Sequence, residues 1–185
     1  MPSVFDPKSF RKKNAGVLGM GRSGQSVARL LAKKGFKVLG SDARPRAELK
    51  TVLKGLPAKV KWEGGGHSDR LLACSFVVKS PGLKPDLPIL KKLADKNIPI
   101  YSELEIALAF SKAKGVVAIT GTNGKSTTTA LTLEIFKAGL PRGRKAILGG
   151  NIGIPISTSA PSAKATDECM PFEPSRAGDF CLSNS

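Results

Sequence analysis

The residues best suited to chemistry lie in one glycine-rich loop, which runs Gly121, Thr122, Asn123, Gly124, Lys125, Ser126 and Thr127. Apolar β-branched residues precede the loop and a threonine-rich helical segment follows it. In that setting the backbone N–H groups and the helix N-terminus attract an anion. Lys125 can neutralise the β- and γ-phosphates of a nucleotide, and Ser126 or Thr127 offers a hydroxyl to Mg²⁺. The loop therefore predicts binding of ATP or GTP.

This loop departs from the strict P-loop pattern G-x-x-x-x-G-K-[ST], which requires glycine where the chain has Ile119. We interpret it as a variant phosphate-binding loop. The alternative is a plain turn, in which Gly121 and Gly124 only redirect the chain and Lys125 begins an ordinary helix. A phosphate-binding loop by itself does not name a reaction.

A second glycine loop, Gly19–Gly24, has the pattern G-x-G-x-x-G between an apolar run and a helical segment. Asp42 closes the next expected strand, 18 residues after Gly24. In a dinucleotide-binding fold, Gly21 would let a diphosphate approach the backbone and Asp42 would hold a ribose. The alternative is close packing of strand on helix, with Asp42 as a strand-end cap.

Two further places carry weaker signals. His67 follows three glycines, but no second ligand stands at metal spacing, so we interpret it as an exposed loop residue. Ser80, Pro81 and Gly82 end an expected strand, where open α/β sheets place ligand contacts. A plain turn fits these three residues equally well.

The elements that must position these loops alternate between strand and helix. Apolar runs predict strands at 15–18, 37–40, 75–78 and 98–101, and helical periodicity fills the intervals between them. This alternation predicts an α/β fold whose first domain, residues 1–112, is a Rossmann-like, doubly wound parallel sheet.

A new strand at 116–119, a helix at about 125–138 and a strand at 146–148 predict the start of a P-loop-type α/β domain over residues 113–156. Residues 157–185 are rich in serine and proline and show no periodicity. We expect them to form a disordered tail.

Composition narrows the class of protein. The net charge of +16 is scattered, with no basic arm or aromatic platform, so we expect no nucleic-acid partner. No secretory h-region and no apolar run of about 18 residues is present, so we expect no membrane partner. Three cysteines, Cys74, Cys169 and Cys181, lack C-x-x-C spacing and fit a cytoplasmic protein.

The pairing of the two loops resembles the Mur ligase family. The segments that carry the resemblance are, in order, GVLGMGRSGQSVARLLAKKGFKVLGSDARP, VVKSPGL, IYSELEIAL, VVAITGTNGKSTTTALT and GGNIGIP. They are most similar to the members that join D-glutamate to UDP-N-acetylmuramoyl-L-alanine. The resemblance covers residues 15–156.

The resemblance implies roles for residues at matching positions. ATP would be held by the loop from Gly121 to Thr127, with Lys125 as the catalytic charge and Ser126 and Thr127 towards Mg²⁺. The UDP-linked substrate would contact Gly21, Arg22, Ser23, Asp42, Arg44, Ser80, Pro81, Gly82 and Asn151. Ala43 stands where the family usually offers a hydroxyl. In this family the first domain binds a UDP group and not a nicotinamide cofactor.

The implied reaction is ATP-dependent amide formation. The γ-phosphoryl group passes to the alanyl carboxylate, and the amine of D-glutamate attacks the resulting acyl phosphate. The family's later acidic motif, metal-site histidine and lysine, and C-terminal domain have no counterpart after Ile156. We therefore expect this chain alone to bind the UDP substrate and not to ligate.

Two other classes stay open at this point. One is a non-catalytic UDP-sugar or nucleotide-binding module that uses the first domain. The other is a nicotinamide-dependent oxidoreductase, which would leave the second loop without a purpose. The sequence does not predict an oligomeric state.

Overall fold

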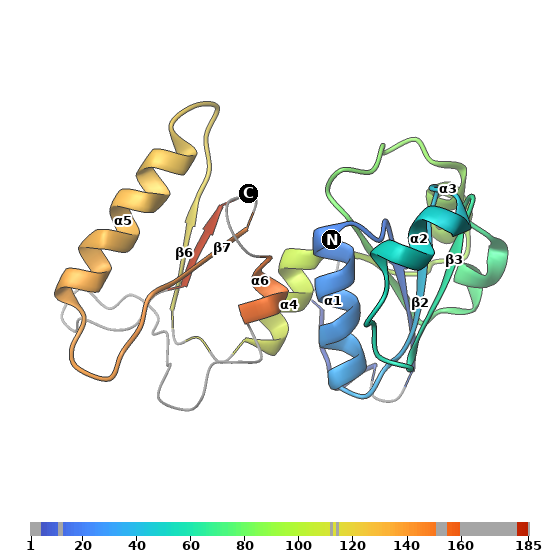
Figure 1. Cartoon of the computed structure of the whole chain (residues 1–185), viewed down its shortest axis with the longest axis horizontal. Coiled ribbons are helices and arrows are strands. Elements are labelled where there is room, and N and C mark those ends of the chain that lie inside the picture. Colours follow the sequence, from blue (N-terminus) through green and yellow to red (C-terminus); the bar gives the residue numbers. More distant parts are fainter. Residues whose placement is uncertain are drawn as a thin grey trace. The chain divides into compact units, whose positions relative to one another are not determined.

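The computed structural model describes residues 5–10, 13–111, 113, 115–150, 155–159 and 181–184. Its internal contacts divide the chain into two compact units, Met1–Ala109 and Phe110–Ser185. Both units mix helices and strands, as Figure 1 shows in chain order. Among the described helices, none is long and apolar enough to cross a membrane.

In the described part of the first unit, five parallel strands form a sheet in the order β3-β2-β1-β4-β5. They are β1 (Asn14–Leu18), β2 (Lys37–Asp42), β3 (Val60–Gly64), β4 (Phe76–Lys79) and β5 (Ile100–Ser102). The chain winds outward through β2 and β3, then crosses back past β1 to β4 and β5. The carboxyl ends of β1 and β4 meet where this winding reverses, which is where doubly wound sheets bind ligands.

Helices connect the strands and cover both faces of this sheet. They are α1 (Arg22–Lys33), α2 (Arg46–Val52), the 3₁₀ helix η1 (Asp69–Ala73), α3 (Pro88–Asp95) and α4 (Glu103–Phe110). Because crossovers between parallel strands are right-handed, α1 and α2 lie on one face and η1 and α3 on the other. On the second face, Leu71, Ile89 and Leu93 pack with Leu18 and Val77 in one buried cluster.

The expected alternation of strand and helix is confirmed in this unit, but two elements have no counterpart in the sequence prediction. They are the edge strand β3 and the short helix η1. In β3, only Val60 is buried, and apolar Val60 and Trp62 alternate with polar Lys61 and Glu63. This alternation over four residues is the signal of a half-buried strand, and the sequence prediction overlooked it.

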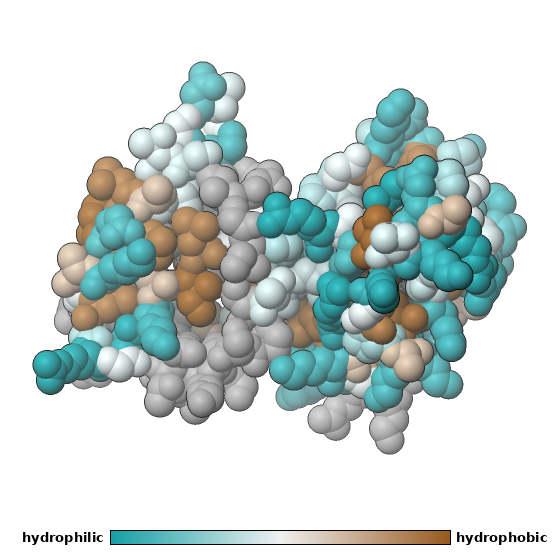
Figure 2. All heavy atoms as spheres, viewed as in Figure 1, coloured by the Kyte–Doolittle hydropathy of each residue, from teal (hydrophilic) through white to brown (hydrophobic). Residues whose placement is uncertain are grey.

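In the described part of the second unit, three parallel strands pair in the order β6-β8-β7. They are β6 (Val116–Ile119), β7 (Ile147–Gly150) and β8 (Cys181–Asn184). The glycine loop joins β6 to α5 (Lys125–Gly139), and α6 (Ile156–Ser159) follows β7. Leu131 and Ile135 of α5 are 62% and 61% exposed, and Figure 2 shows apolar surface in the region of this helix.

The expected disorder over residues 157–185 needs correction at both ends of that segment. α6 extends to Ser159, and β8 lies between β6 and β7 as the middle strand. A four-residue strand is too short to show periodicity, and its pairing with β6 and β7 depends on contacts far apart in the sequence. Residues 160–180 and 185 lie outside the described part of the chain.

Candidate functional site

The first candidate site is a pocket of about 380 Å³ at the carboxyl ends of β1, β2 and β4. Its walls are the loop after β1, the end of β2 and the turn after β4. The lining residues are Gly19, Gly21, Arg22, Ser23, Asp42, Arg44, Ser80, Pro81, Gly82 and Leu83. The parallel topology thus gathers at one edge three segments that lie far apart in the sequence.

Two glycines of the loop after β1 differ in the reason why the position needs glycine. A Cβ on Gly24 would lie 1.8 Å from the carbonyl oxygen of Gly19, so α1 can begin this close to β1 only with glycine there. Gly21, in contrast, has a φ of −72°, and no described atom lies within 4 Å of a Cβ built on it. The protein's own packing does not require glycine at position 21, whereas a ligand lying against the backbone would.

Asp42 and Arg44 form a hydrogen-bonded pair, the Asp42–Arg44 clamp, at the end of β2. Asp42 Oδ1 accepts from the backbone N–H and Nε of Arg44 at 2.9 and 3.0 Å. Asp42 Oδ2 accepts from the N–H of Met20 at 2.7 Å and from Arg44 Nη2 at 2.9 Å. Four protein donors therefore fill the acceptor positions of this carboxylate.

The charge of the clamp follows from these contacts. Burial opposes ionisation of Asp42, but the hydrogen bonds from Arg44 and Met20 outweigh it and lower the pKa of Asp42 to about 2. The side chain of Asp42 is 10% exposed and that of Arg44 is 39% exposed. Asp42 thus holds the base of the clamp, and Arg44 presents its guanidinium at the pocket wall.

The turn after β4 is tied to the glycine loop. The N–H of Ser80 donates to the carbonyl of Leu18 at 3.0 Å, and its hydroxyl donates to the carbonyl of Gly19 at 2.8 Å. The N–H of Gly19 donates to the carbonyl of Ser41 on β2 at 2.8 Å. These bonds connect the three walls of the pocket, so the protein itself shapes the site before any ligand enters.

The structure brings most of the residues predicted to hold the UDP substrate into this one pocket. Those lining it are Gly21, Arg22, Ser23, Asp42, Arg44, Ser80, Pro81 and Gly82. Asn151 lies outside the described residues. The sequence reasoning missed Leu83, which adds an apolar wall, and Met20, whose backbone N–H helps to hold Asp42. No side-chain pattern marks a backbone donor such as that of Met20.

The second candidate site is the loop from Gly121 to Gly124, which ends at the N-terminus of α5. Gly124 is the N-cap of the helix and has a φ of 77°, a conformation that favours glycine. The Nζ of Lys125 donates to the carbonyls of Gly121 and Thr122, the latter at 3.3 Å. Gly121 to Gly124, Ser126 and Thr127 are exposed, so the predicted ATP residues form one accessible loop around Lys125.

The chemistry of this loop fits a phosphate group. The N-terminus of the 15-residue helix α5 carries a partial positive charge, and Lys125 adds a full one. For Mg²⁺, the described residues contain no cluster of three His, Cys, Asp or Glu side chains. The hydroxyls of Ser126 and Thr127 are oxygen groups of the kind that can face a Mg²⁺ ion held by phosphate and water.

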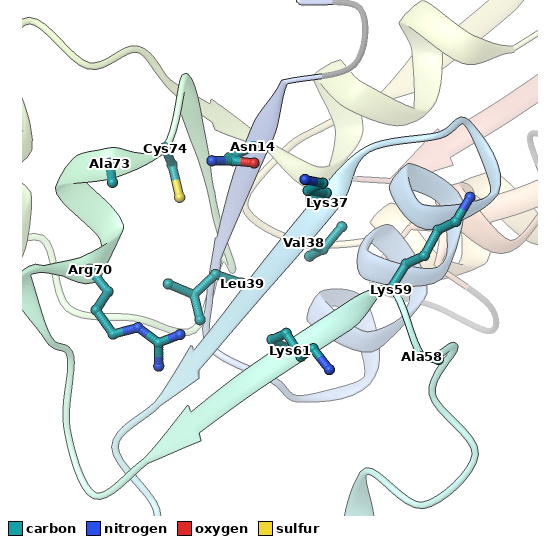
Figure 3. Close-up of a pocket in the computed structure, with 10 residues that line it drawn as sticks. All are labelled: Asn14, Lys37, Val38, Leu39, Ala58, Lys59, Lys61, Arg70, Ala73 and Cys74. Atoms are coloured by element: carbon teal, nitrogen blue, oxygen red, sulfur yellow. The ribbon is translucent and has the colours of Figure 1, made fainter.

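Another hollow, of about 510 Å³, lies over β2 and β3 beside η1 (Figure 3). Lys37, Lys59, Lys61 and Arg70 line it around Leu39. Cys74 also lines it; burial raises the pKa of this thiol to about 11, so it stays protonated and unreactive. No residue predicted as a site residue lines this hollow, and it lies away from the reversal point of the sheet.

Comparison with known proteins gives the family of the chain. Residues 13–102 match the family described as Mur ligase MurD-like, N-terminal domain. The UDP-N-acetylmuramoylalanine–D-glutamate ligase of Elusimicrobium minutum is 42% identical over 168 residues, which are 89% of this chain and 36% of that protein. Residues 13–102 belong to the MurD-like N-terminal domains of the Mur ligases.

Other comparisons agree with this assignment. The UDP-N-acetylmuramoylalanine–D-glutamate ligase of Streptococcus agalactiae is 38% identical over 161 residues, which are 86% of this chain and 35% of that protein. The solved UDP-N-acetylmuramate:L-alanyl-gamma-D-glutamyl-meso-diaminopimelate ligase of Neisseria meningitides has a TM-score of 0.52 at 20% identity, covering 94% of this chain and 52% of that one. At that identity the likeness shows the fold alone. The chain spans about a third of the length of these curated relatives.

Within this Mur ligase domain, one group near the clamp was misread from the sequence. His67, expected to be exposed, is half-buried, and its Nδ1 lies 2.8 Å from Ser41 Oγ. The prediction failed because the loop after β3 folds back over the end of β2, where Asp42 and Gly66 form an isolated β-bridge. The three glycines at 64–66 are the sequence signal for such a tight loop, since Gly65 and Gly66 have positive φ.

Proposed function

We propose that residues 1–112 are the UDP-substrate-binding domain, and residues 113–156 the start of the ATP-binding domain, of a ligase that joins D-glutamate to UDP-N-acetylmuramoyl-L-alanine. The observation that carries the proposal is the preformed pocket at the reversal point of the sheet, with the clamp on one wall and the open backbone of Gly21 on another. The names of the curated relatives support the amino acid and the sugar nucleotide.

Each wall of the pocket has a part in this proposal. The backbone at Gly21, with Arg22 and Ser23 at the first turn of the 12-residue helix α1, suits the diphosphate. Arg44 offers a planar cation with unused donors to the uridine. Asp42 has no acceptor position left for a ribose hydroxyl, so it acts by fixing Arg44. The names of the curated relatives favour a UDP ligand over the nicotinamide cofactor considered from the sequence.

In the ATP part, Lys125 would leave the carbonyls of its own loop and move to the β- and γ-phosphates. Gly121 and Gly124 would present backbone N–H groups to the same phosphates. Bound Mg²⁺ would supply charge neutralisation at the phosphates, with Ser126 and Thr127 as its nearest hydroxyls. The contribution of these residues to phosphoryl transfer is positioning and electrostatic stabilisation.

Calorimetric titration of the purified chain with UDP-N-acetylmuramoyl-L-alanine tests the first part of the proposal. We expect saturable 1:1 binding that Arg44→Ala weakens by about tenfold or more, since a hydrogen bond to a charged group contributes roughly 1.5–3 kcal/mol. Arg29→Ala, an exposed arginine of α1, is the matched control and should leave binding unchanged. Tighter binding of NAD⁺ than of the UDP ligand would overturn the proposal.

Phosphate release from ATP, measured with UDP substrate and Mg²⁺ with and without D-glutamate, tests the second part. If the chain binds the UDP ligand but releases no phosphate from ATP, the result agrees with the expectation from sequence that the chain alone does not ligate. The same result would be given by a non-catalytic binding module. Release that depends on D-glutamate would show that this chain completes a ligase site by itself and would contradict that expectation.

A further inference from the structure

The loop after β3 contains the single histidine of the chain, His67. Its imidazole is half-buried, and Nδ1 lies 2.8 Å from Ser41 Oγ. Its other ring nitrogen, Nε2, is buried and has no hydrogen-bond partner among the described residues. A buried polar atom without a partner is costly and calls for an explanation.

The hydrogen bonds around Ser41 fix which nitrogen of His67 carries the hydrogen. Ser41 is fully buried, and its Oγ lies 2.9 Å from Glu63 Oε1. Burial opposes ionisation of Glu63, but hydrogen bonds from Ser68 and Ser41 outweigh it and lower the pKa of Glu63. The carboxylate can only accept, so Ser41 donates to it, and His67 Nδ1–H donates to Ser41 in turn.

This chain of bonds, the Ser41–Glu63–His67 chain, supports the nucleotide pocket directly. Ser41 precedes Asp42 on β2, and the N–H of Gly66 donates to the carbonyl of Asp42 at 3.3 Å. The N–H of Gly65 donates to the carbonyl of Arg44 at 2.8 Å. The loop that holds His67 is therefore paired with the backbone of both clamp residues.

Glu63 fastens the far end of the same loop. Its Oε1 accepts from the N–H of Ser68 at 2.9 Å, and its Oε2 accepts from the hydroxyl of Ser68 at 2.6 Å. The Oε2 atom also lies 3.8 Å from the guanidinium of Arg70, which is exposed. With Ser68 held by Glu63 and His67 held by Ser41, the loop has two fixed points over the clamp.

The charge state of His67 depends on opposing influences. Burial lowers the pKa of the imidazole, while the negative charges of Asp42 on β2 and Glu63 on β3 raise it, and the net shift is downward. Arg44 and Arg70, each paired with one of those carboxylates, offset part of their attraction. Protonation would place an N–H at Nε2, where the described residues offer no acceptor. The neutral imidazole is therefore the form that suits the surroundings of His67.

We propose that neutral His67 is a positioning residue for the UDP site, because it holds the loop after β3 against the Asp42–Arg44 clamp. Proton uptake by His67 releases this loop and weakens binding of the UDP-linked ligand. The proposal rests on the proposed function for its ligand. Its structural part, that the ring holds the loop, is independent of any ligand.

The first experiment measures affinity for UDP-N-acetylmuramoyl-L-alanine between about pH 5.5 and pH 8, the range in which histidine titrates. The diphosphate of this ligand is esterified at both ends, so it has no protonation step near pH 6. Because the pKa of the imidazole is lowered below 6.5, we expect binding to weaken only at the acid end, by at most about tenfold at pH 5.5, as His67 takes up its proton. His67→Asn keeps an N–H donor near the position of Nδ1 and should bind at all pH values as the native protein does at pH 8. His67→Ala should bind weakly throughout.

The second experiment follows the imidazole itself by NMR, where one histidine gives one assignable set of signals. Because the neutral form binds the ligand better, saturation with the UDP ligand should lower the pKa of His67 further. An unchanged imidazole pKa on saturation, or the same pH dependence in His67→Asn as in the native protein, would overturn the proposal.

The third experiment separates this proposal from the proposed function. Hydrogen exchange of the Gly65 and Gly66 amides is measured in the ligand-free protein. We expect His67→Ala to lower the protection of both amides about tenfold, and His67→Asn to restore it. Unchanged protection in His67→Ala overturns the positioning role even if the native protein binds UDP. Lost protection with no UDP binding by the native protein would overturn the proposed function alone.

Discussion

The two glycine loops of this chain suit the same kind of anionic group, but the protein supports them very differently. The loop after β1 lies against Ser80, Asp42 and the start of α1, and Gly24 touches the backbone of Gly19. The loop after β6 is exposed, and Thr129 is the one described residue of α5 that is buried. Lys125 makes its hydrogen bonds to carbonyls of its own loop.

This difference bears on how each loop meets a ligand. The first loop is held in place by the fold, so little conformational entropy is lost when a ligand binds to it. Mutations in this loop should therefore affect both folding and binding. The second loop carries its charge on Lys125, which in the proposed function exchanges its hydrogen bonds within the loop for bonds to phosphate. Mutations there act on binding and leave the fold intact.

Gly24→Ala should show the largest effect, because its methyl group would enter the carbonyl of Gly19. We expect a loss of about 3 kcal/mol or more in the free energy of unfolding of the first unit. The single tryptophan, Trp62 on β3, reports this unit by fluorescence during urea unfolding. Gly21→Ala is the control: it should cost less than about 1 kcal/mol in stability yet weaken UDP-ligand binding. Equal destabilisation by the two variants would contradict the assigned packing.

Asp42→Asn comes next, since it removes a charge held by four donors. The pKa of Asp42 is lowered from 3.8 to about 2 on folding. The stabilisation, about 2 kcal/mol, is therefore complete above about pH 4 and is lost as the pH falls through 2. Native protein should lose this stability in acid unfolding followed by Trp62, whereas Asp42→Asn should lack it already at neutral pH. Asp95→Asn, at the exposed end of α3, should behave as native protein. A native-like profile for Asp42→Asn would refute the clamp.

Lys125→Met tests the second loop and should leave the fold unchanged. We expect affinity for a fluorescent ATP analogue with Mg²⁺ to fall about tenfold or more, in line with the loss of a charged hydrogen bond. The far-UV circular dichroism and thermal unfolding should match those of native protein. Lys137→Met, in the last turn of the same helix and paired with Glu134, is the matched control. The loop would not be a nucleotide site if both variants bound the analogue equally well.

Lys92→Ala should have the smallest effect. Lys92 Nζ lies 2.7 Å from Asp69 Oδ1, but both side chains are more than half exposed. A solvated pair of this kind contributes about 0.2–1 kcal/mol or less. We expect a change of under about 0.5 kcal/mol in urea unfolding of the first unit, decreasing further with added salt. A larger, salt-independent loss would mean that the pair matters to η1 and α3 more than its exposure indicates.

Much of the fold was predictable because its signals are local. The buried runs of β1 and β4, the apolar run of β6 and the apolar stripe of α1 are local patterns that show which element they form. Gly21, Asp42 and the turn from Ser80 to Gly82 could be predicted at the pocket, because parallel topology sends the carboxyl ends of strands to one edge. The roles of Arg22, Ser23 and Arg44 came from the family resemblance. The edge strand β3 was missed although its residues alternate between apolar and polar. The inserted strand β8 could not be predicted, since it is defined by the strands that it pairs with.

The sequence by itself determined the two loops, the alternation of strand and helix, and the family, because glycine spacing and apolar periodicity are properties of neighbouring residues. Only the tertiary structure decided what Asp42 does. Its partners Met20 and Arg44, and the His67 loop beside it, come from three turns of the chain that the sheet brings to one edge. A carboxylate with four donors anchors an arginine, and one with free oxygens binds a ribose; that distinction depends on contacts in space.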